Sequence, residues 1–142
     1  MRNVTLTVCL LGSCIFCFLL VSRGDSAEGS SVVGAYKPVA PLHGLMYGQQ
    51  VMFKEIRKAI GDKTTRERGE VIEHLSQALA ELANVNTYHN EKADYRAWAG
   101  QLRDTALELA EVAEEKVIDE AKMDKLVRKI KGTCGDCHDA YQ

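Results

Sequence analysis

The sequence predicts an all-α protein, an antiparallel four-helix bundle whose C-terminal helix carries the binding site. Both prolines, Pro38 and Pro41, precede residue 42, and none follows it. Beyond that point apolar residues recur at three- and four-residue steps in four segments of about 20 residues. Short polar connections separate these segments, and strand-like alternation is absent from the sequence. Amphipathic helices with short connections typically form up-down-up-down bundles.

The first expected helix spans residues 42–60 and the second spans residues 66–86. Gly61 and Asp62 should end the first helix, and Thr65 is the expected N-cap of the second. The apolar positions of the two segments are Leu42, Leu45, Met46, Met52, Phe53, Ile56, Ile60, Ile72, Leu75, Leu79 and Leu82. A basic cluster around their connection, expected to be solvated, consists of Arg57, Lys58, Arg66 and Arg68.

The third expected helix spans residues 94–116, and the fourth follows Asp119, its expected cap. The inward positions of the third helix are Tyr95, Trp98, Leu102, Leu109 and Ala113. The apolar stripe of the fourth contains Met123, Val127, Ile130, Cys134, Cys137, His138 and Tyr141. Because the two cysteines share a seam with apolar residues, whatever they bind should lie inside the helical body.

The last helix contains a C-x-x-C-H motif, formed by Cys134, Cys137 and His138. This pattern is typical of a covalently attached c-type haem. Two thiols one helical turn apart can each form a thioether with a haem vinyl group, and the adjacent histidine can bind the iron. A redox dithiol or half of a zinc site is the plainer interpretation. A zinc site would need further ligands, and beyond residue 24 the chain has only these two cysteines.

The N-terminal segment 1–24 has the pattern of a secretory signal peptide. Arg2 precedes an apolar run over residues 4–21, and small residues follow, with cleavage expected near Gly24 or Ala27. The length of the run leaves open that it is kept as a membrane anchor. Cys9, Cys14 and Cys17 would leave with a cleaved peptide. Export fits the motif, because bacteria join haem to C-x-x-C-H on the periplasmic side of the membrane.

Three segments follow from this division: a signal peptide at 1–24, an irregular leader at 25–41 and one bundle domain at 42–142. Loss of residues 1–24 removes two arginines and leaves 16 basic against 20 acidic residues, a net charge of −4. No strongly basic face is implied, so nucleic acid is not an expected partner. After signal removal, membrane association is not expected either.

Residues 129–141, with the sequence KIKGTCGDCHDAY, resemble the C-terminal haem helix of the class II cytochromes c. This family includes cytochrome c-prime and its low-spin relatives, and a weaker similarity lies in residues 97–99. The resemblance covers residues 42–142 and implies a four-helix bundle with one haem c near one end. It also implies a distal residue on the first helix, which is methionine in six-coordinate carriers and usually apolar in gas-binding members.

The first helix offers three candidates for that distal position: Met46, Met52 and His43. In an antiparallel bundle His138 lies level with the start of this helix, which favours Met46. Met52 is about 9 Å deeper along the axis, although residues 49–52 loosely resemble the distal segment of cytochrome c-prime. An iron without a sixth protein ligand is the remaining alternative.

The expected function is that of an exported, periplasmic monohaem cytochrome c that carries single electrons between redox partner proteins and is not an enzyme. Its ligands would be His138 and Met46, with Cys134 and Cys137 holding the haem. The alternatives are a five-coordinate protein that binds nitric oxide or carbon monoxide, and a structural bundle with a dithiol and no haem. The sequence leaves open whether the protein is a monomer or a homodimer.

Overall fold

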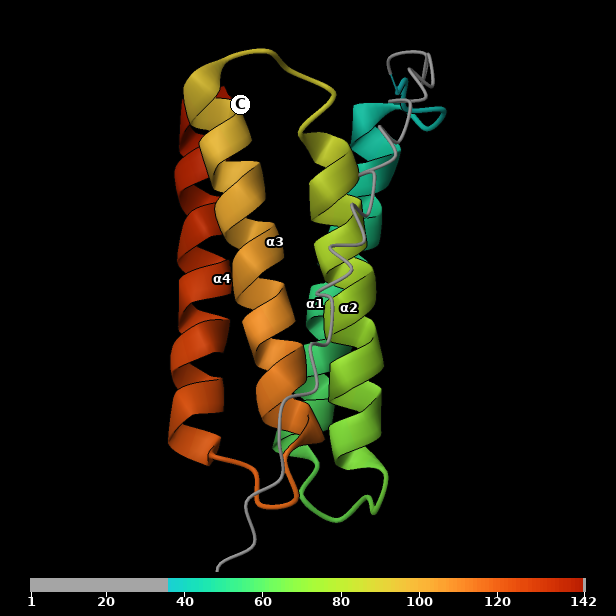
Figure 1. Cartoon of the computed structure of the whole chain (residues 1–142), viewed down its shortest axis with the longest axis vertical. Helices are drawn as coiled ribbons and strands as arrows, with labels where there is room; N and C mark the ends of the chain where they lie inside the picture. Colours follow the sequence, from blue (N-terminus) through green and yellow to red (C-terminus); the bar gives the residue numbers. More distant parts are fainter. Residues whose placement is uncertain (1–35, 142) are drawn as a thin grey trace, which may run out of the picture. The chain divides into compact units, whose positions relative to one another are not determined.

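The computed structural model describes residues 36–141 as four α-helices, and this part of the chain contains no strand (Figure 1). The helices are α1 (Leu42–Gly61), α2 (Arg68–Asn86), α3 (Ala93–Glu114) and α4 (Glu120–Tyr141). The predicted fold class is therefore confirmed. The expected signal peptide and almost all of the expected leader lie outside the described residues.

Successive helices run in opposite directions and pack against one another along the chain (Figure 1). Close packing joins α2 to α3, α1 to α2 and α3 to α4, whereas α1 and α4 do not form a closely packed pair. The start of α1, the end of α2, the start of α3 and the end of α4 meet at one end of the bundle, called the cavity end below. Residues of both α1 and α4 line the cavity described below, which lies at this end of the bundle.

The core consists of apolar side chains from all four helices. The largest of those with essentially no exposed surface are Ile56, Ile72, Leu79, Leu109, Val112, Met123 and Ile130. Burying each large aliphatic side chain contributes about 1.5–3 kcal/mol. Met52 is half-buried and packs against this core.

Hydrogen bonds around Asp62 determine where α2 begins, and they show that Thr65 is not its N-cap. The Thr64 hydroxyl donates to Asp62 Oδ1 at 2.6 Å, and the Thr65 hydroxyl donates to Asp62 Oδ2 at 2.7 Å. These hydroxyl donors, that of Thr64 first, lower the pKa of Asp62 to about 2. The Thr65 hydroxyl bonds to Asp62 and does not cap α2. The helix therefore starts at Arg68, two residues later than expected. At α4 the expected cap is confirmed, since Asp119 Oδ1 accepts the Lys122 N–H at 2.9 Å.

The expectation that the whole basic cluster is solvated is wrong for Arg68. This residue is buried, whereas the rest of the cluster is exposed. Its guanidinium donates to the carbonyls of Ala59 and Ile60 at 3.2 and 3.0 Å, at the end of α1. It also donates to both carboxylate oxygens of Glu120, at 2.6 and 2.9 Å. One side chain of α2 thus joins the end of α1 to the start of α4, which explains its burial.

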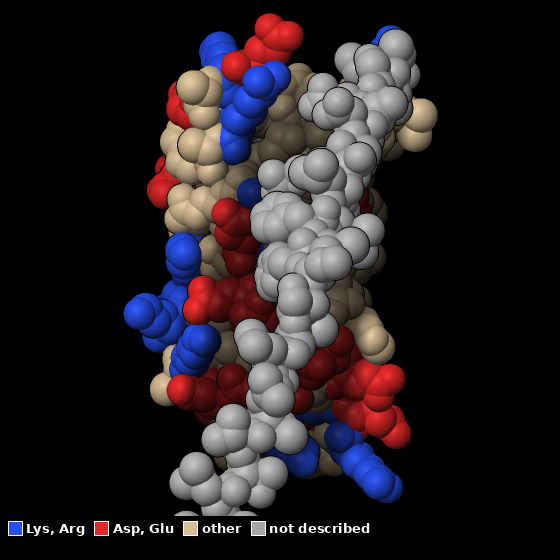
Figure 2. Space-filling model, viewed as in Figure 1, with Lys and Arg blue, Asp and Glu red and all other residues tan. Residues whose placement is uncertain are grey.

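The surface drawn in Figure 2 carries both acidic and basic side chains over the described helices, in keeping with the moderate net charge. Within residues 36–141, no helix has the length and apolar character needed to cross a bilayer.

Candidate haem-binding site

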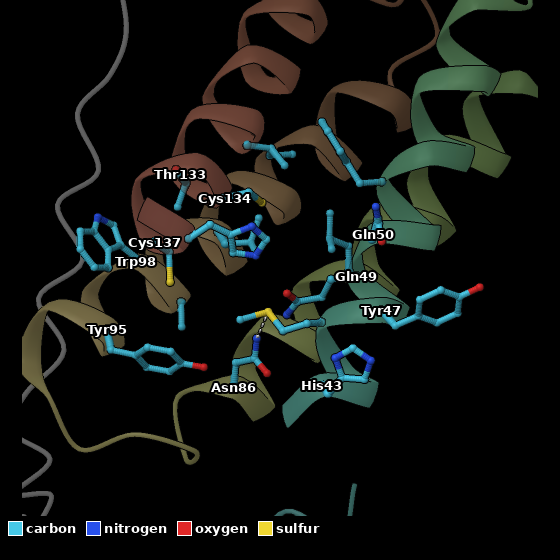
Figure 3. Close-up of a pocket in the computed structure, with 17 residues that line it drawn as sticks. His43, Tyr47, Gln49, Gln50, Asn86, Tyr95, Trp98, Thr133, Cys134 and Cys137 are labelled. Atoms are coloured by element: carbon cyan, nitrogen blue, oxygen red, sulfur yellow. Dashed lines mark hydrogen bonds between the residues drawn. The ribbon is translucent and has the colours of Figure 1, made fainter. Parts of the chain in front are cut away.

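A cavity of about 300 Å³ lies at the cavity end, and all four helices contribute to its walls (Figure 3). Its apolar lining includes Phe53, Leu79, Ala99, Leu102 and Ile130. Cys134, Cys137 and His138 line it from α4, and Met46 and His43 line it from α1. The structure therefore brings the residues of the C-x-x-C-H motif together with two of the three distal candidates. The volume is in the range of small-molecule and cofactor pockets.

The α4 wall presents the motif in the order that haem attachment requires. Cys134 and Cys137 are one helical turn apart, half-buried, and not joined in a disulfide. Burial raises the pKa of both thiols, with a smaller effect of Cys137 on Cys134 and of Asp94 on Cys137. The His138 side chain is exposed at the edge of the cavity.

These surroundings suit neither of the plainer interpretations of the two cysteines. Redox dithiols have a lowered thiol pKa, whereas here both values are raised. Residues 36–141 contain no group of three or more Cys, His, Asp or Glu side chains that could hold a metal ion. A zinc site built from the two cysteines would need such a group.

An aromatic cluster holds the end of α4 against the start of α3. The Tyr141 ring meets Tyr95 and Trp98 edge-on, with centroids 5.3 and 6.0 Å apart. The Tyr141 hydroxyl donates to Asp94 Oδ1 at 2.6 Å, which raises the pKa of Tyr141 to about 12 and lowers that of Asp94. Because Tyr141 lies three residues beyond His138, these contacts position the last turn of α4.

Met46 of α1 also lines the cavity, and so do the amide side chains of Gln49 and Asn86 (Figure 3). Met46 is half-buried, and its sulfur accepts a hydrogen bond from Asn86 Nδ2 at 3.8 Å. Gln49 Nε2, Asn86 Oδ1 and Tyr95 Oη are buried without a hydrogen-bond partner among the described residues. Unpaired buried polar atoms are rare in folded proteins. Their gathering around one cavity indicates a space that is made to hold a ligand.

Met52 does not line the cavity. It lies six residues beyond Met46, about 240° further round the helix at 100° per residue, and it faces the core. The prediction from sequence compared the two methionines by their height along the helix and by the loose resemblance of residues 49–52 to a distal segment. It did not use this difference in angle around the helix axis.

Gln49 and Asn86 were not singled out from the sequence. Asn86 does continue an apolar stripe of α2, because it lies seven residues after Leu79, which itself lies seven after Ile72. A polar residue in register with such a stripe is a signal that could have found it.

An apolar cavity with a C-x-x-C-H turn on one wall and a thioether on the other suits a haem, and in a four-helix bundle it defines a bundle-type cytochrome. The family model described as Cytochrome C' matches residues 76–142 of the chain. This match supports a class II cytochrome c of the cytochrome c-prime-like family, and haem c is the cofactor that this family implies. Comparison with curated proteins and with solved structures found no match.

Proposed function

We propose that this cytochrome is an exported monohaem electron carrier that passes single electrons between redox partner proteins. In this proposal Cys134 and Cys137 hold one haem through thioethers, His138 is the proximal ligand and Met46 is the distal ligand. The bound haem supplies the ferric–ferrous couple. Export rests on the pattern of residues 1–24, and neither nucleic acid nor a membrane surface is a proposed partner.

The observation that carries the proposal is the placement of Met46 and His138 on the same cavity, from α1 and α4 respectively. A methionine sulfur opposite a histidine nitrogen is a common axial pair in electron-carrying cytochromes. The thioether is a soft, neutral ligand that favours ferrous iron. A filled sixth site also limits ligand rearrangement between the two oxidation states, as fast electron transfer requires.

The chain's own residues supply the surroundings of the cofactor. Leu79, Leu102 and Ile130 exclude water from the inner part of the cavity. The contacts of Tyr141 with α3 fix the helical turn that carries His138. A low-dielectric, rigid setting of this kind is how a protein determines the reduction potential of a bound haem.

The competing function is binding of a small gas at an open iron site, and replacement of Met46 separates the two. The wild-type protein should have the absorption spectrum of low-spin, six-coordinate haem in both oxidation states. Met46→Ala should produce a high-spin spectrum, a lower reduction potential and rapid carbon monoxide binding.

Met52→Ala is the matched control, because it removes the same side chain from the same helix outside the cavity. It should lower the free energy of unfolding by about 2 kcal/mol, the low end for such a truncation, and leave the spectrum unchanged. If the wild-type ferrous protein is high-spin and binds carbon monoxide without displacing a ligand, the gas-binding function replaces the carrier function.

Haem attachment itself is tested with a pyridine haemochrome assay on the purified protein. We expect one haem per chain, retained after acid–acetone extraction because the thioethers are covalent. The double variant Cys134→Ala, Cys137→Ala should lose this retained haem. Retention of covalent haem by the double variant would contradict the attachment proposal, and absence of haem from the wild-type protein would leave the structural bundle.

A further inference from the structure

The strongest unassigned feature of the cavity is the contact between Asn86 and Met46. Asn86 is only 3% exposed, and its Nδ2 lies 3.8 Å from the Met46 sulfur (Figure 3). The amide has no other hydrogen bond among the described residues, and its Oδ1 is unpaired. Within residues 36–141, this buried amide from α2 therefore has a single partner, the sulfur of a side chain on α1.

A thioether sulfur is a weak hydrogen-bond acceptor, so burial of an amide for this bond alone needs an explanation. Methionine is unbranched and adopts many rotamers, and the bond restricts where its sulfur lies. The sulfur has two lone pairs. It can accept the amide hydrogen with one and donate the other to a metal ion.

We propose that Asn86 is a positioning residue for the sixth ligand, which holds the Met46 sulfur toward the cavity and shifts the redox equilibrium toward ferrous iron. This inference rests on the proposed function, in which Met46 is the distal ligand. It adds a second helix to the ligand site, because α2 then controls a side chain of α1.

The direction of the effect follows from charge. A donated N–H withdraws electron density from the sulfur, and ferric iron needs that density more than ferrous iron does. The positive end of the amide dipole also points toward the ligand, which disfavours the more highly charged ferric state. Loss of the amide should therefore lower the reduction potential. It should also loosen the sulfur and let carbon monoxide displace it more readily.

The test is Asn86→Leu, made in the wild-type protein and in Met46→Ala. Leucine has the same branched heavy-atom skeleton as asparagine, and removal of an amide whose oxygen is already unpaired should leave folding nearly unchanged. With Met46 present, the equilibrium constant for reduction should fall about three- to ten-fold, the range of one hydrogen bond. The apparent affinity for carbon monoxide should rise. With Ala at position 46, Asn86→Leu should change neither quantity, because the amide has lost the sulfur through which it acts.

Gln49→Leu is the matched control. Gln49 is 7% exposed, lines the same cavity and carries an amide, but it makes no hydrogen bond to the Met46 sulfur. Its effect on the potential should be the same with methionine or alanine at position 46. Coupling to Met46 that is seen for Asn86 and not for Gln49 supports a specific role of the amide–sulfur bond.

The outcomes separate the two proposals. If Met46→Ala leaves a low-spin spectrum unchanged, another group is the sixth ligand: the carrier function then stands, but Met46 as distal ligand and the role of Asn86 both fail. If Met46→Ala opens the site but Asn86→Leu shifts neither the potential nor carbon monoxide affinity, the ligand stands and the role of Asn86 is refuted. If Asn86→Leu tightens the sulfur, raises the potential and weakens carbon monoxide binding, the amide holds the sulfur off the iron and the inference is overturned.

Discussion

Arg68 joins three helices at the end of the bundle opposite the cavity, and its replacement by alanine should strongly destabilise the protein. Its guanidinium donates to the carbonyls of Ala59 and Ile60 and to the Glu120 carboxylate. Arg68→Ala leaves the two carbonyls at the C-terminal end of α1 without their charged donor. It also removes the only side-chain link between α2 and the start of α4 that the described residues show at this point.

The magnitude follows from these contacts. Each hydrogen bond from a charged donor is worth about 1.5 kcal/mol at the low end of its range, so the two carbonyls account for about 3 kcal/mol. The Glu120 side chain is 44% exposed, so its ion pair adds only about 0–1 kcal/mol. The expected loss is about 3–4 kcal/mol, a large part of the 5–15 kcal/mol typical of a domain.

The assay is urea unfolding of the haem-loaded protein, followed by far-ultraviolet circular dichroism. Glu120→Gln is the control, since it weakens the ion pair but leaves Arg68 on the two carbonyls. It should cost less than about 1 kcal/mol. The haem absorption spectrum should be unchanged in both variants. A loss below 1 kcal/mol for Arg68→Ala, or one equal to that of Glu120→Gln, would refute the reasoning that the carbonyl contacts dominate.

Three further predictions test helix packing, the α4 contacts and the cavity. A Cβ at Gly69 would lie 2.7 Å from the Ala113 carbonyl oxygen, whereas one at Gly132 would meet nothing within 4 Å. Urea unfolding should show Gly69→Ala destabilised by about 1–3 kcal/mol and Gly132→Ala stabilised by about 0.5–1 kcal/mol. The Tyr141 pKa is raised from 10.0 to about 12, so the stability from its bond to Asp94 is present below pH 10 and lost as the pH rises through about 12. Ultraviolet titration should show this late-titrating tyrosine in the wild type, its absence in Tyr141→Phe, and its return toward 10 in Asp94→Asn. Haem-free protein should keep its helical signal but melt without cooperativity, because the cavity is then unfilled; a cooperative melt as high as that of the loaded protein would contradict this.

Periodicity was enough to predict the helices, because burial of one face is the main determinant of where a helix forms in a bundle. Ile56, Ile72 and Ile130 were all expected inside and are fully buried. The motif at Cys134 also indicated the end of the bundle where a site should lie. The periodicity and the motif are both local in the sequence, so one sequence is enough to predict the features that depend on them.

Features that depend on partners distant in sequence could not be read in this way. Arg68 and Glu120 are 52 residues apart, and the sequence around Arg68 is that of an exposed basic turn. Asn86 and Met46, whose side chains share a hydrogen bond, are 40 residues apart in the sequence. Such contacts depend on how two helices are rotated toward each other, which the periodicity of either helix alone does not determine.

The open seam between α1 and α4 makes the proposed cofactor a cross-link. With His138 and Met46 as axial ligands, iron would close a loop of about 90 residues, and closure of a long loop removes much entropy from the unfolded chain. The thioethers would keep the haem on α4 even in the unfolded chain, so the bond to Met46 alone would open and close this loop. Since methionine binds ferrous iron more tightly, reduction of the iron would strengthen its bond to Met46 and oxidation would weaken that bond. The oxidation state of the iron would then set how firmly the first helix of the bundle is held to the last.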